Sequence, residues 1–408
     1  MARFTLIRRP TSMRQLALKL FVLALLVSPC AHEALAQRAQ RVPAQGFDKV
    51  ARMAEEARSA NRVEDAIKLY RQAVSIRPRW AEGWFNLGTL LYDKDAYADA
   101  ATALNRAAAL GPQVGTTWVL LGLCEFRLGR HAAALEHIQR GRKLGVTANP
   151  QLRNVMLYHE GLLLVGKGDF ERAQETLGQL SQEGVESAEL LTALGLSVLR
   201  LRFSELLAGD AALREIAARA GRAAHLAAQE KFDEARAEYE RLAADFPKGQ
   251  NVHYALGRFL LTSNEDEKGV AELLREIENN PKHLLAHLLI ADAKLRLREY
   301  SAGLPYAEEA AKLSPRLPLA HYLLGSLLLG AGQTARAVTE LETAARLMPG
   351  EPKIFYALSN AYSRAGRKQD AERALATFAR LREQSEGGDA GQGANVQAGD
   401  RVSGPRQP

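Results

Sequence analysis

The chain has 408 residues and a formal net charge of +7, with 47% hydrophobic and 25% charged residues. This is an ordinary composition for a soluble protein. Residues 1–36 carry five Arg or Lys against one Glu, a net of +4, so the remainder carries only +3 (7 − 4). Such a weak charge, without a basic stripe interleaved with aromatic residues, argues against nucleic-acid binding.

The N-terminal segment has the pattern of an export signal. Residues 20–27 read LFVLALLV, follow a basic stretch, and precede the small-x-small triplet at residues 34–36. These features predict a secretory signal peptide over residues 1–36, cleaved between Ala36 and Gln37. The apolar core is shorter than the roughly 20 residues that span a bilayer. We therefore expect no integral membrane span after cleavage and an extracytoplasmic location, in a periplasm or secreted.

Three other fates of this segment compete with cleavage at Ala36. The pair Arg8-Arg9 permits export of the folded protein, although residues 10–12 do not continue that motif. Cys30 permits lipid attachment, although Pro29 replaces the small residue expected before it. The segment also permits an uncleaved anchor.

A 34-residue period follows from the prolines, which stand at positions 78 and 112 and again at 247, 281, 315 and 349. With proline at position 32, units begin at 47, 81, 216, 250, 284, 318 and 352. Apolar or small residues recur at positions 4, 7, 8 and 11, one face of a helix, and at positions 20, 24 and 27 of a second helix. Proline then ends that second helix. The period predicts stacked helix pairs.

The period is interrupted in the middle of the chain. Residues 149–153 form an insertion, and a weaker unit starts at Asn154. Residues 188–215 are shorter than one unit and show the first helix but not the pattern of the second. Two interpretations remain open for this degenerate repeat: a drifted spacer, or a hinge between two binding surfaces.

These units resemble the tetratricopeptide repeat (TPR) family. The unit from Ala81 carries the pattern most clearly, with Trp84, Leu87, Gly88 and Pro112. The resemblance covers residues 47–385. It implies an all-α TPR solenoid, a right-handed superhelix of antiparallel helix pairs, with about nine repeats plus one degenerate repeat. The predicted domains are a linker (37–46), an N-terminal TPR array (47–187), the degenerate repeat or hinge (188–215), a C-terminal TPR array (216–385) and a disordered tail (386–408).

No catalytic or cofactor motif stands out from the repeats. The run Gly161 to Gly168 resembles a phosphate-binding loop, but it lacks the Ser or Thr that holds Mg²⁺ and lies in a helical pattern. His253, His287 and His321 occupy position 4 of consecutive repeats; packing is the simplest explanation, and a metal-binding or pH-sensitive ladder the alternative. We expect a non-enzymatic protein with no cofactor, no metal and no catalytic residue.

The resemblance also implies a partner and a surface. In TPR proteins, positions 2, 5, 9, 12 and 13 of the first helix line a concave groove that binds a peptide or partner helix. The residues carried over to this groove are Phe85, Tyr92, Phe126, Tyr158, Asn251, Tyr254, Arg258, Arg296, Tyr322, Tyr356, Asn360 and Arg364. The expected function is an extracytoplasmic scaffold or adaptor for a protein or peptide. The alternatives are an accessory subunit of envelope assembly or polysaccharide export, and a self-assembling structural protein. The sequence sets no oligomeric state.

The signal-peptide hypothesis predicts the N-terminus of the exported protein. Edman sequencing of protein recovered from outside the cytoplasm should begin at Gln37, because signal peptidase cuts after a small-x-small triplet. A product that still contains Leu20 would rule cleavage out.

Overall fold

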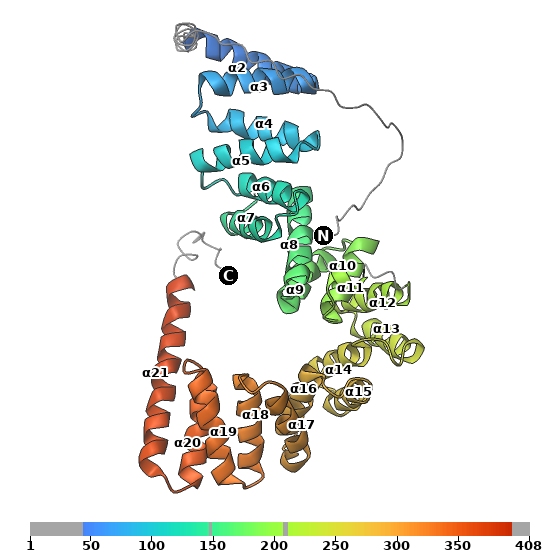
Figure 1. The fold of residues 1–408 in the computed structure, drawn as a ribbon, viewed down its shortest axis with the longest axis vertical. Coiled ribbons are helices and arrows are strands. Elements are labelled where there is room, and N and C mark those ends of the chain that lie inside the picture. Colours follow the sequence, from blue (N-terminus) through green and yellow to red (C-terminus); the bar gives the residue numbers. More distant parts are fainter. Residues whose placement is uncertain (1–43, 147–148, 207–210, 394–408) are drawn as a thin grey trace, which may run out of the picture. The chain divides into compact units, whose positions relative to one another are not determined.

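The computed structural model describes residues 44–146, 149–206 and 211–393. Within these ranges every regular element is a helix, as the all-α prediction requires (Figure 1). The predicted signal peptide, its Ala36–Gln37 cleavage point and residues 394–408 lie outside the described part. No helix in the described part combines the length and apolarity that a bilayer span requires.

The chain forms two compact units that meet between Glu186 and Ser187. The N-terminal unit contains four helix pairs, each a first helix followed by a second. Its helices are α2 (Ala44–Ser59), α3 (Val63–Ile76), α4 (Ala81–Asp93), α5 (Tyr97–Leu110), α6 (Gly115–Arg127), α7 (His131–Leu144), α8 (Pro150–Lys167) and α9 (Phe170–Gln182).

The C-terminal unit continues with the same alternation after an irregular start (Figure 1). Its helices are α10 (Ala188–Val198), α11 (Phe203–Leu206), α12 (Ala211–Ala228), α13 (Phe232–Asp245), α14 (Val252–Thr262), α15 (Asp266–Asn279), α16 (Leu284–Arg296), α17 (Tyr300–Leu313), α18 (Pro318–Gly330), α19 (Thr334–Leu347), α20 (Pro352–Arg364) and α21 (Lys368–Gly393).

Each helix pair turns at position 15, which lies in the left-handed region of backbone conformation in all nine repeats. Glycine fills this position four times, and Asn or Asp, the next most tolerant residues, three times. Glu230 and Arg298 adopt the same conformation without that advantage, so the surrounding helices impose it. The residues are Asn61, Asp95, Gly129, Gly168, Glu230, Asn264, Arg298, Gly332 and Gly366.

The two helices of a pair meet at the small residue of position 8. A Cβ atom placed on Gly88 would lie 2.6 Å from Leu104 Cγ, and one on Gly325 would lie 2.6 Å from Leu341 Cγ. Leu104 and Leu341 occupy position 24 and are fully buried. The predicted packing of a small residue against a large one is therefore present, and it brings the helix axes close together.

Two of the predicted domain boundaries, at residues 46 and 386, fall inside helices. The linker was expected to reach residue 46, but α2 already begins at Ala44. Phe47 is buried against Trp80, with ring centroids 5.2 Å apart, so the helix that carries it starts earlier. Disorder was expected from residue 386, but α21 continues to Gly393. The last unit lacks the proline of position 32 that follows six of the other second helices.

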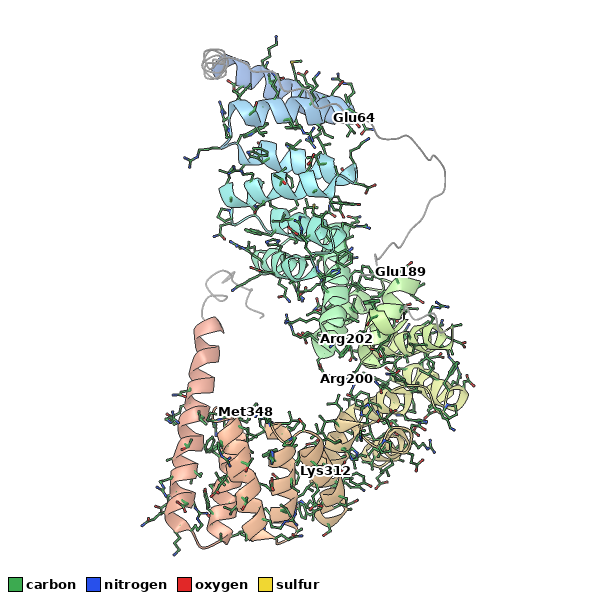
Figure 2. The ribbon with its side chains drawn as sticks, in the orientation of Figure 1. Glu64, Glu189, Arg200, Arg202, Lys312 and Met348 are labelled. Atoms are coloured by element: carbon green, nitrogen blue, oxygen red, sulfur yellow. The ribbon has the colours of Figure 1, made fainter. Side chains whose placement is uncertain are left out.

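The degenerate repeat is built into the C-terminal unit. Its first helix, α10, ends at a turn that contains Arg200, which is labelled in Figure 2. The backbone of Arg200 is left-handed, with φ 55°. Its missing second helix is α12, which begins inside the segment 188–215 and packs against both α10 and α13. One long helix thus serves two pairs, which explains why the sequence pattern of a separate second helix is absent.

Two glycines bring the backbones of α10 and α12 together. A Cβ atom on Gly195 would overlap the carbonyl oxygen of Ala217, and one on Gly221 would overlap the carbonyl oxygen of Leu191. Because each obstacle is main chain, no side-chain rotation relieves it.

We predict that Gly195→Ala and Gly221→Ala each destabilise the protein by about 1–3 kcal/mol, since the helices must move apart to admit the methyl group. Thermal and urea unfolding monitored by circular dichroism would measure this. Gly166→Ala is the matched control: a Cβ there meets nothing within 4 Å. It should stabilise its helix by up to about 1 kcal/mol. Equal effects at all three positions would contradict the close packing.

Candidate binding surface

First helices of successive repeats contact one another within each unit. In the N-terminal unit α4 touches α6 and α6 touches α8; in the C-terminal unit the series runs α12, α14, α16, α18 and α20. Each unit therefore presents a continuous face built only from first helices. We call these the N-terminal and C-terminal first-helix faces.

The N-terminal first-helix face carries aromatic side chains on three successive first helices. Phe85, Tyr92, Phe126 and Tyr158 are all half-buried. The ring of His159 lies 4.8 Å from that of Phe126 and 5.4 Å from that of Tyr158, edge-on to both. Edge-on ring contacts of this kind are favourable and hold the rings in a defined orientation. Sequence analysis missed His159 because it lies outside the positions carried over from the family.

Burial controls the charge on this face. Burial lowers the pKa of His159 and raises the pKa of Tyr92. Both side chains are thus held in their neutral forms near neutral pH. The guanidinium of Arg127 lies 5.7 Å from the ring of Tyr97, which contacts Tyr92 edge-on at 5.5 Å. The aromatic cluster of this face is therefore neutral, and the Arg127 guanidinium lies near its edge.

The C-terminal first-helix face is more polar and more exposed. Tyr356 is 52% exposed and contacts Phe378 at 5.4 Å, while Tyr322 is half-buried under the ammonium group of Lys353 at 5.6 Å. Lys353 stands at position 2, a lining position of the family, so its place could have been found from the sequence.

Two other predicted residues of this face are exposed on α20. Asn360 and Arg364 lie one helical turn apart. Arg364 Nη1 donates a hydrogen bond to the carbonyl oxygen of Leu329 at 2.9 Å, which ties α20 to the end of α18. Asn360 is exposed, and its amide group is of the kind that can pair with a ligand backbone.

Two predicted lining residues are structural instead. Tyr254 is only 3% exposed, stacks near His283 at 4.8 Å, and donates its backbone N–H to Glu276 Oε2 at 3.1 Å. Asn251 is left-handed, with φ 59°, and its amide donates to the Leu199 carbonyl at 2.6 Å. Asn251 is thus held by the residue after α10, and Tyr254 by its own repeat and by a buried cluster that it shares with residues of α16. The repeat frame does not reveal these contacts.

The two remaining arginines are engaged by neighbouring side chains. Arg296 forms ion pairs with Asp266 at 2.9 Å and with Asp292 at 3.3 Å, although its own side chain is partly exposed. Arg258 is half-buried near Tyr239, whose pKa burial raises to about 12. The structure therefore brings Tyr322, Tyr356, Asn360 and Arg364 together, and separates Asn251 and Tyr254 from them.

The ladder at position 4 has a structural explanation. In five repeats the ring N–H at this position donates to the carbonyl oxygen of the proline that ends the preceding repeat. The bonds are Trp84 to Pro78 (2.9 Å), Trp118 to Pro112 (3.0 Å), His253 to Pro247 (3.0 Å), His287 to Pro281 (2.9 Å) and His321 to Pro315 (3.0 Å). Trp and His are interchangeable here because both carry a ring N–H.

Metal binding by these histidines finds no support in the described residues. No group of three or more His, Cys, Asp or Glu side chains is placed to hold a metal ion there. His283 accepts a hydrogen bond from the Ala286 N–H at 3.0 Å and so caps α16. The phosphate-loop candidate also fails: Gly161 lies inside α8, where a Cβ atom would overlap the Leu177 side chain.

His253 and His321 each have a second hydrogen-bond partner, a glutamate, which the other three residues at position 4 lack. Their Nδ1 atoms lie 2.7 Å from Glu272 and Glu340 respectively. The proline carbonyl can only accept, so Nε2 carries a proton, and an ionised glutamate requires another on Nδ1. At His253 this geometry favours the imidazolium form. The hydrogen bond to Glu272 raises the pKa of His253, against the opposing effect of burial.

Other charges surround His253. It borders a cavity of about 650 Å³ between α13 and α15, also lined by Glu240, Lys248 and Arg275. Arg275 pairs with Glu272 at 2.6 Å, so the carboxylate is shared between two cations.

The repeats and their uninterrupted first-helix faces define a helical-repeat binding protein. Models of the tetratricopeptide repeat match residues 52–115, 97–148, 220–283 and 288–352, and a second model with the same description matches 328–386. The chain belongs to the tetratricopeptide repeat family. Proteins of this fold are typically non-catalytic scaffolds that bind protein or peptide partners. The matched ranges leave out residues 149–219, the irregular part of the array.

Several solved structures match the chain at low identity. A MamA double mutant of strain RS-1 is 18% identical, covering 44% of this chain and 98% of that chain, with a TM-score of 0.41. MamA from residue 41 of Desulfovibrio magneticus RS-1 is 20% identical, covering 44% and 97%, with a TM-score of 0.38. YrrB, described as a TPR protein with an unusual peptide-binding site, is 16% identical, covering 39% and 82%, with a TM-score of 0.36. No curated protein matches the chain.

The His253–Glu272 pair predicts a pH-dependent stability. Because the folded-state pKa of His253 is raised, its contribution is fully present below the unfolded value of about 6.5 and is lost as pH rises through the folded value. A hydrogen bond to a charged group contributes about 1.5–3 kcal/mol. Unfolding free energies of the wild type and Glu272→Gln, measured from pH 5.5 to 9, should differ most at low pH and converge at high pH. Parallel curves would contradict the assignment.

Proposed function

We propose that this protein is an exported, non-enzymatic scaffold that binds a peptide or helix of another protein on its first-helix faces. The observation that carries the proposal is the continuity of these faces. Successive first helices touch in each unit, and they carry aromatic side chains at the positions that the small-to-large packing leaves free. An extended or helical segment placed across several repeats contacts one row of such side chains per repeat.

The chemistry of the C-terminal first-helix face suits a segment with both apolar and polar groups. Tyr322 and Tyr356 offer ring surface to apolar side chains, and aromatic residues supply much of the affinity of protein interfaces. The amide of Asn360 can pair with the backbone of an extended ligand. Lys353, above the ring of Tyr322, favours a partner with a carboxylate near this point.

The location outside the cytoplasm is supported by the N-terminal sequence, with its basic start, short apolar core and small-x-small triplet. A partner would then belong to the cell envelope or the exterior. A role as an accessory subunit of envelope assembly or polysaccharide export is a special case of this function, in which the bound segment belongs to such a machine. Self-assembly is the alternative in which the bound segment belongs to a second copy.

We predict that Tyr322→Ala combined with Tyr356→Ala abolishes capture of the partner from native cell envelopes and weakens direct binding of the recovered partner by about 1–2 kcal/mol per ring. Phe232→Ala is the matched control. Phe232 is 53% exposed, as Tyr356 is at 52%, but it lies on the second helix α13. Pull-down followed by calorimetric titration would measure both effects.

Circular dichroism must first show that the variants remain equally helical. Capture unaffected by the tyrosine variant, or lost equally in Phe232→Ala, would overturn the first-helix face as the binding surface. Recovery of this chain alone, with mass that rises with concentration in light scattering, would favour self-assembly.

A further inference from the structure

Position 24 changes its environment at the C-terminal end of the array. In every earlier repeat its side chain is buried, at 0–3% exposure, whereas Leu375 in the last repeat is 50% exposed. The buried residues are Tyr70, Leu104, Ile138, Leu177, Tyr239, Leu273, Ala307 and Leu341. The exposure of Leu375 therefore comes from its place at the end of the array and not from its residue type.

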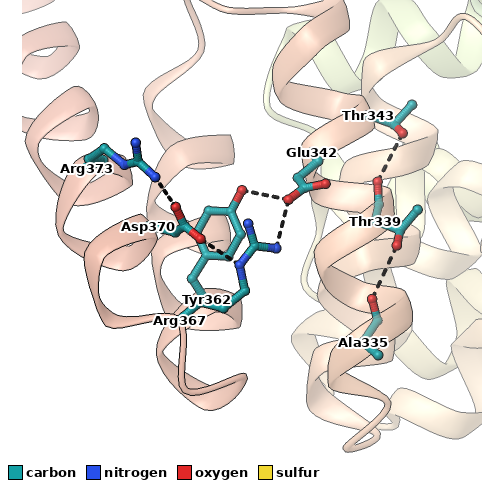
Figure 3. A network of polar contacts seen from close by, with 8 residues as sticks. All are labelled: Ala335, Thr339, Glu342, Thr343, Tyr362, Arg367, Asp370 and Arg373. Atoms are coloured by element: carbon teal, nitrogen blue, oxygen red, sulfur yellow. Dashed lines mark hydrogen bonds and ion pairs between the residues drawn. The ribbon is translucent and has the colours of Figure 1, made fainter.

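On α19 the next first helix covers position 24. α20 packs against α19, and Leu341 at position 24 lies in one buried cluster with Leu358 and Ala361, at positions 7 and 10 of α20. Ile354, at position 3, is also buried. Polar contacts reinforce the junction (Figure 3). Glu342 on α19 accepts hydrogen bonds from Tyr362 Oη at 2.8 Å and Arg367 Nη1 at 3.2 Å. No described helix follows α21, so its equivalent face has no such cover.

The uncovered face of α21 is a stripe of small and apolar residues. Glu372, Leu375, Ala376 and Ala379 are all exposed and follow the spacing i, i+3, i+4 and i+7, so they lie on one side of the helix. The alanines allow another helix to approach closely beside Leu375. We call this stripe the α21 end face.

We propose that the α21 end face docks an amphipathic helix of a partner protein, with uncharged small or apolar residues at i, i+4 and i+7. The argument is continuity with the interface between successive repeats, in which α20, a helix with this pattern, covers position 24 of α19. The site is separate from the first-helix faces, so this inference goes beyond the proposed function and does not depend on it.

The charge of Glu372 restricts which residue should follow the docked helix of the partner. Glu372 occupies position 21 and has no partner among the described interactions. Earlier in the same unit, Arg236 at position 21 forms an ion pair with Glu265, which follows the first helix of the next repeat. By the same geometry the docked helix should be followed by Lys or Arg at the point opposite Glu372.

A second copy stacked head to tail fits this face poorly. Among the described helices, α2 and α10 are the first helices that no repeat precedes in their units. The residues at positions 3, 7 and 10 of α10 are buried, whereas α2 exposes Lys49, Met53 and Glu56 at these positions. Later first helices have buried, uncharged residues at positions 3 and 10. Stacking α2 on the α21 end face would remove Lys49 and Glu56 from water without a described partner, which is costly. The described residues therefore disfavour a contact between α2 and the α21 end face.

The test uses the full chain and a labelled, helix-stapled peptide of residues 352–364, the segment that covers position 24 of α19. Fluorescence anisotropy should show binding to the wild type. Leu375→Asp and Ala376→Arg should each weaken it at least about tenfold, because one introduces a charge and the other blocks close approach. Leu347→Asp, at a leucine that is 37% exposed on α19, is the matched control and should bind as the wild type does. Tyr322→Ala should also bind normally, which separates this site from the first-helix face.

Three results would overturn the proposal. The first is no binding of the peptide to the wild type, and the second is equal binding to Leu375→Asp and Ala376→Arg. The third is a concentration-dependent mass of the full chain that Leu375→Asp abolishes, which would make a second copy the occupant. A peptide with Leu358→Asp should not bind; if it binds equally, the contact is not the repeat interface. Circular dichroism establishes that both variants are folded, as substitutions at exposed positions should be.

Discussion

The contact between a small residue at position 8 and a large residue at position 24 sets the geometry on which the rest of the protein depends. At Gly88 and Gly325 the first helix lies so close to Leu104 and Leu341 of the second helix that a Cβ atom would not fit between them. A larger residue at position 8 would push the helices apart and leave position 24 poorly packed. Because the same contact recurs, each pair presents a similar surface to the next, and the pairs stack into an array.

The junctions between repeats rely on a second recurrent interaction. The proline at position 32 ends the second helix and leaves a carbonyl group that a ring N–H at position 4 of the next repeat satisfies. A buried carbonyl group without a hydrogen-bond partner would be costly. Position 4 therefore holds a ring N–H donor in each of these repeats, whether the residue is Trp or His. Trp118 provides it without titrating. His253 adds a carboxylate contact and with it a dependence on pH.

These two interactions separate the residues that build the array from those that face outward. The core uses positions 8, 20 and 24, and the junction uses positions 4 and 32. Positions on the first-helix faces take part in neither the core nor the junction, and their residues differ between the units. The N-terminal face is aromatic and neutral around Phe126 and His159, whereas the C-terminal face is more polar around Tyr356 and Asn360. The α21 end face arises differently, since Leu375 occupies a core position that has lost its cover.

The sequence by itself determined the helix pairs, their period, the turn at Gly129, Gly168 and Gly366, and the small-to-large packing, because all of these arise within about 34 residues of chain. Tertiary structure alone decided that Tyr254 is buried beside His283, that Asn251 is held by the Leu199 carbonyl, and that α12 completes two helix pairs. The contact of Asn251 and the double role of α12 depend on a segment outside the repeat, and Tyr254 is also buried in one cluster with residues of α16. A periodic pattern records the average environment of a position, whereas burial at one site is set by the particular neighbours that stack on it.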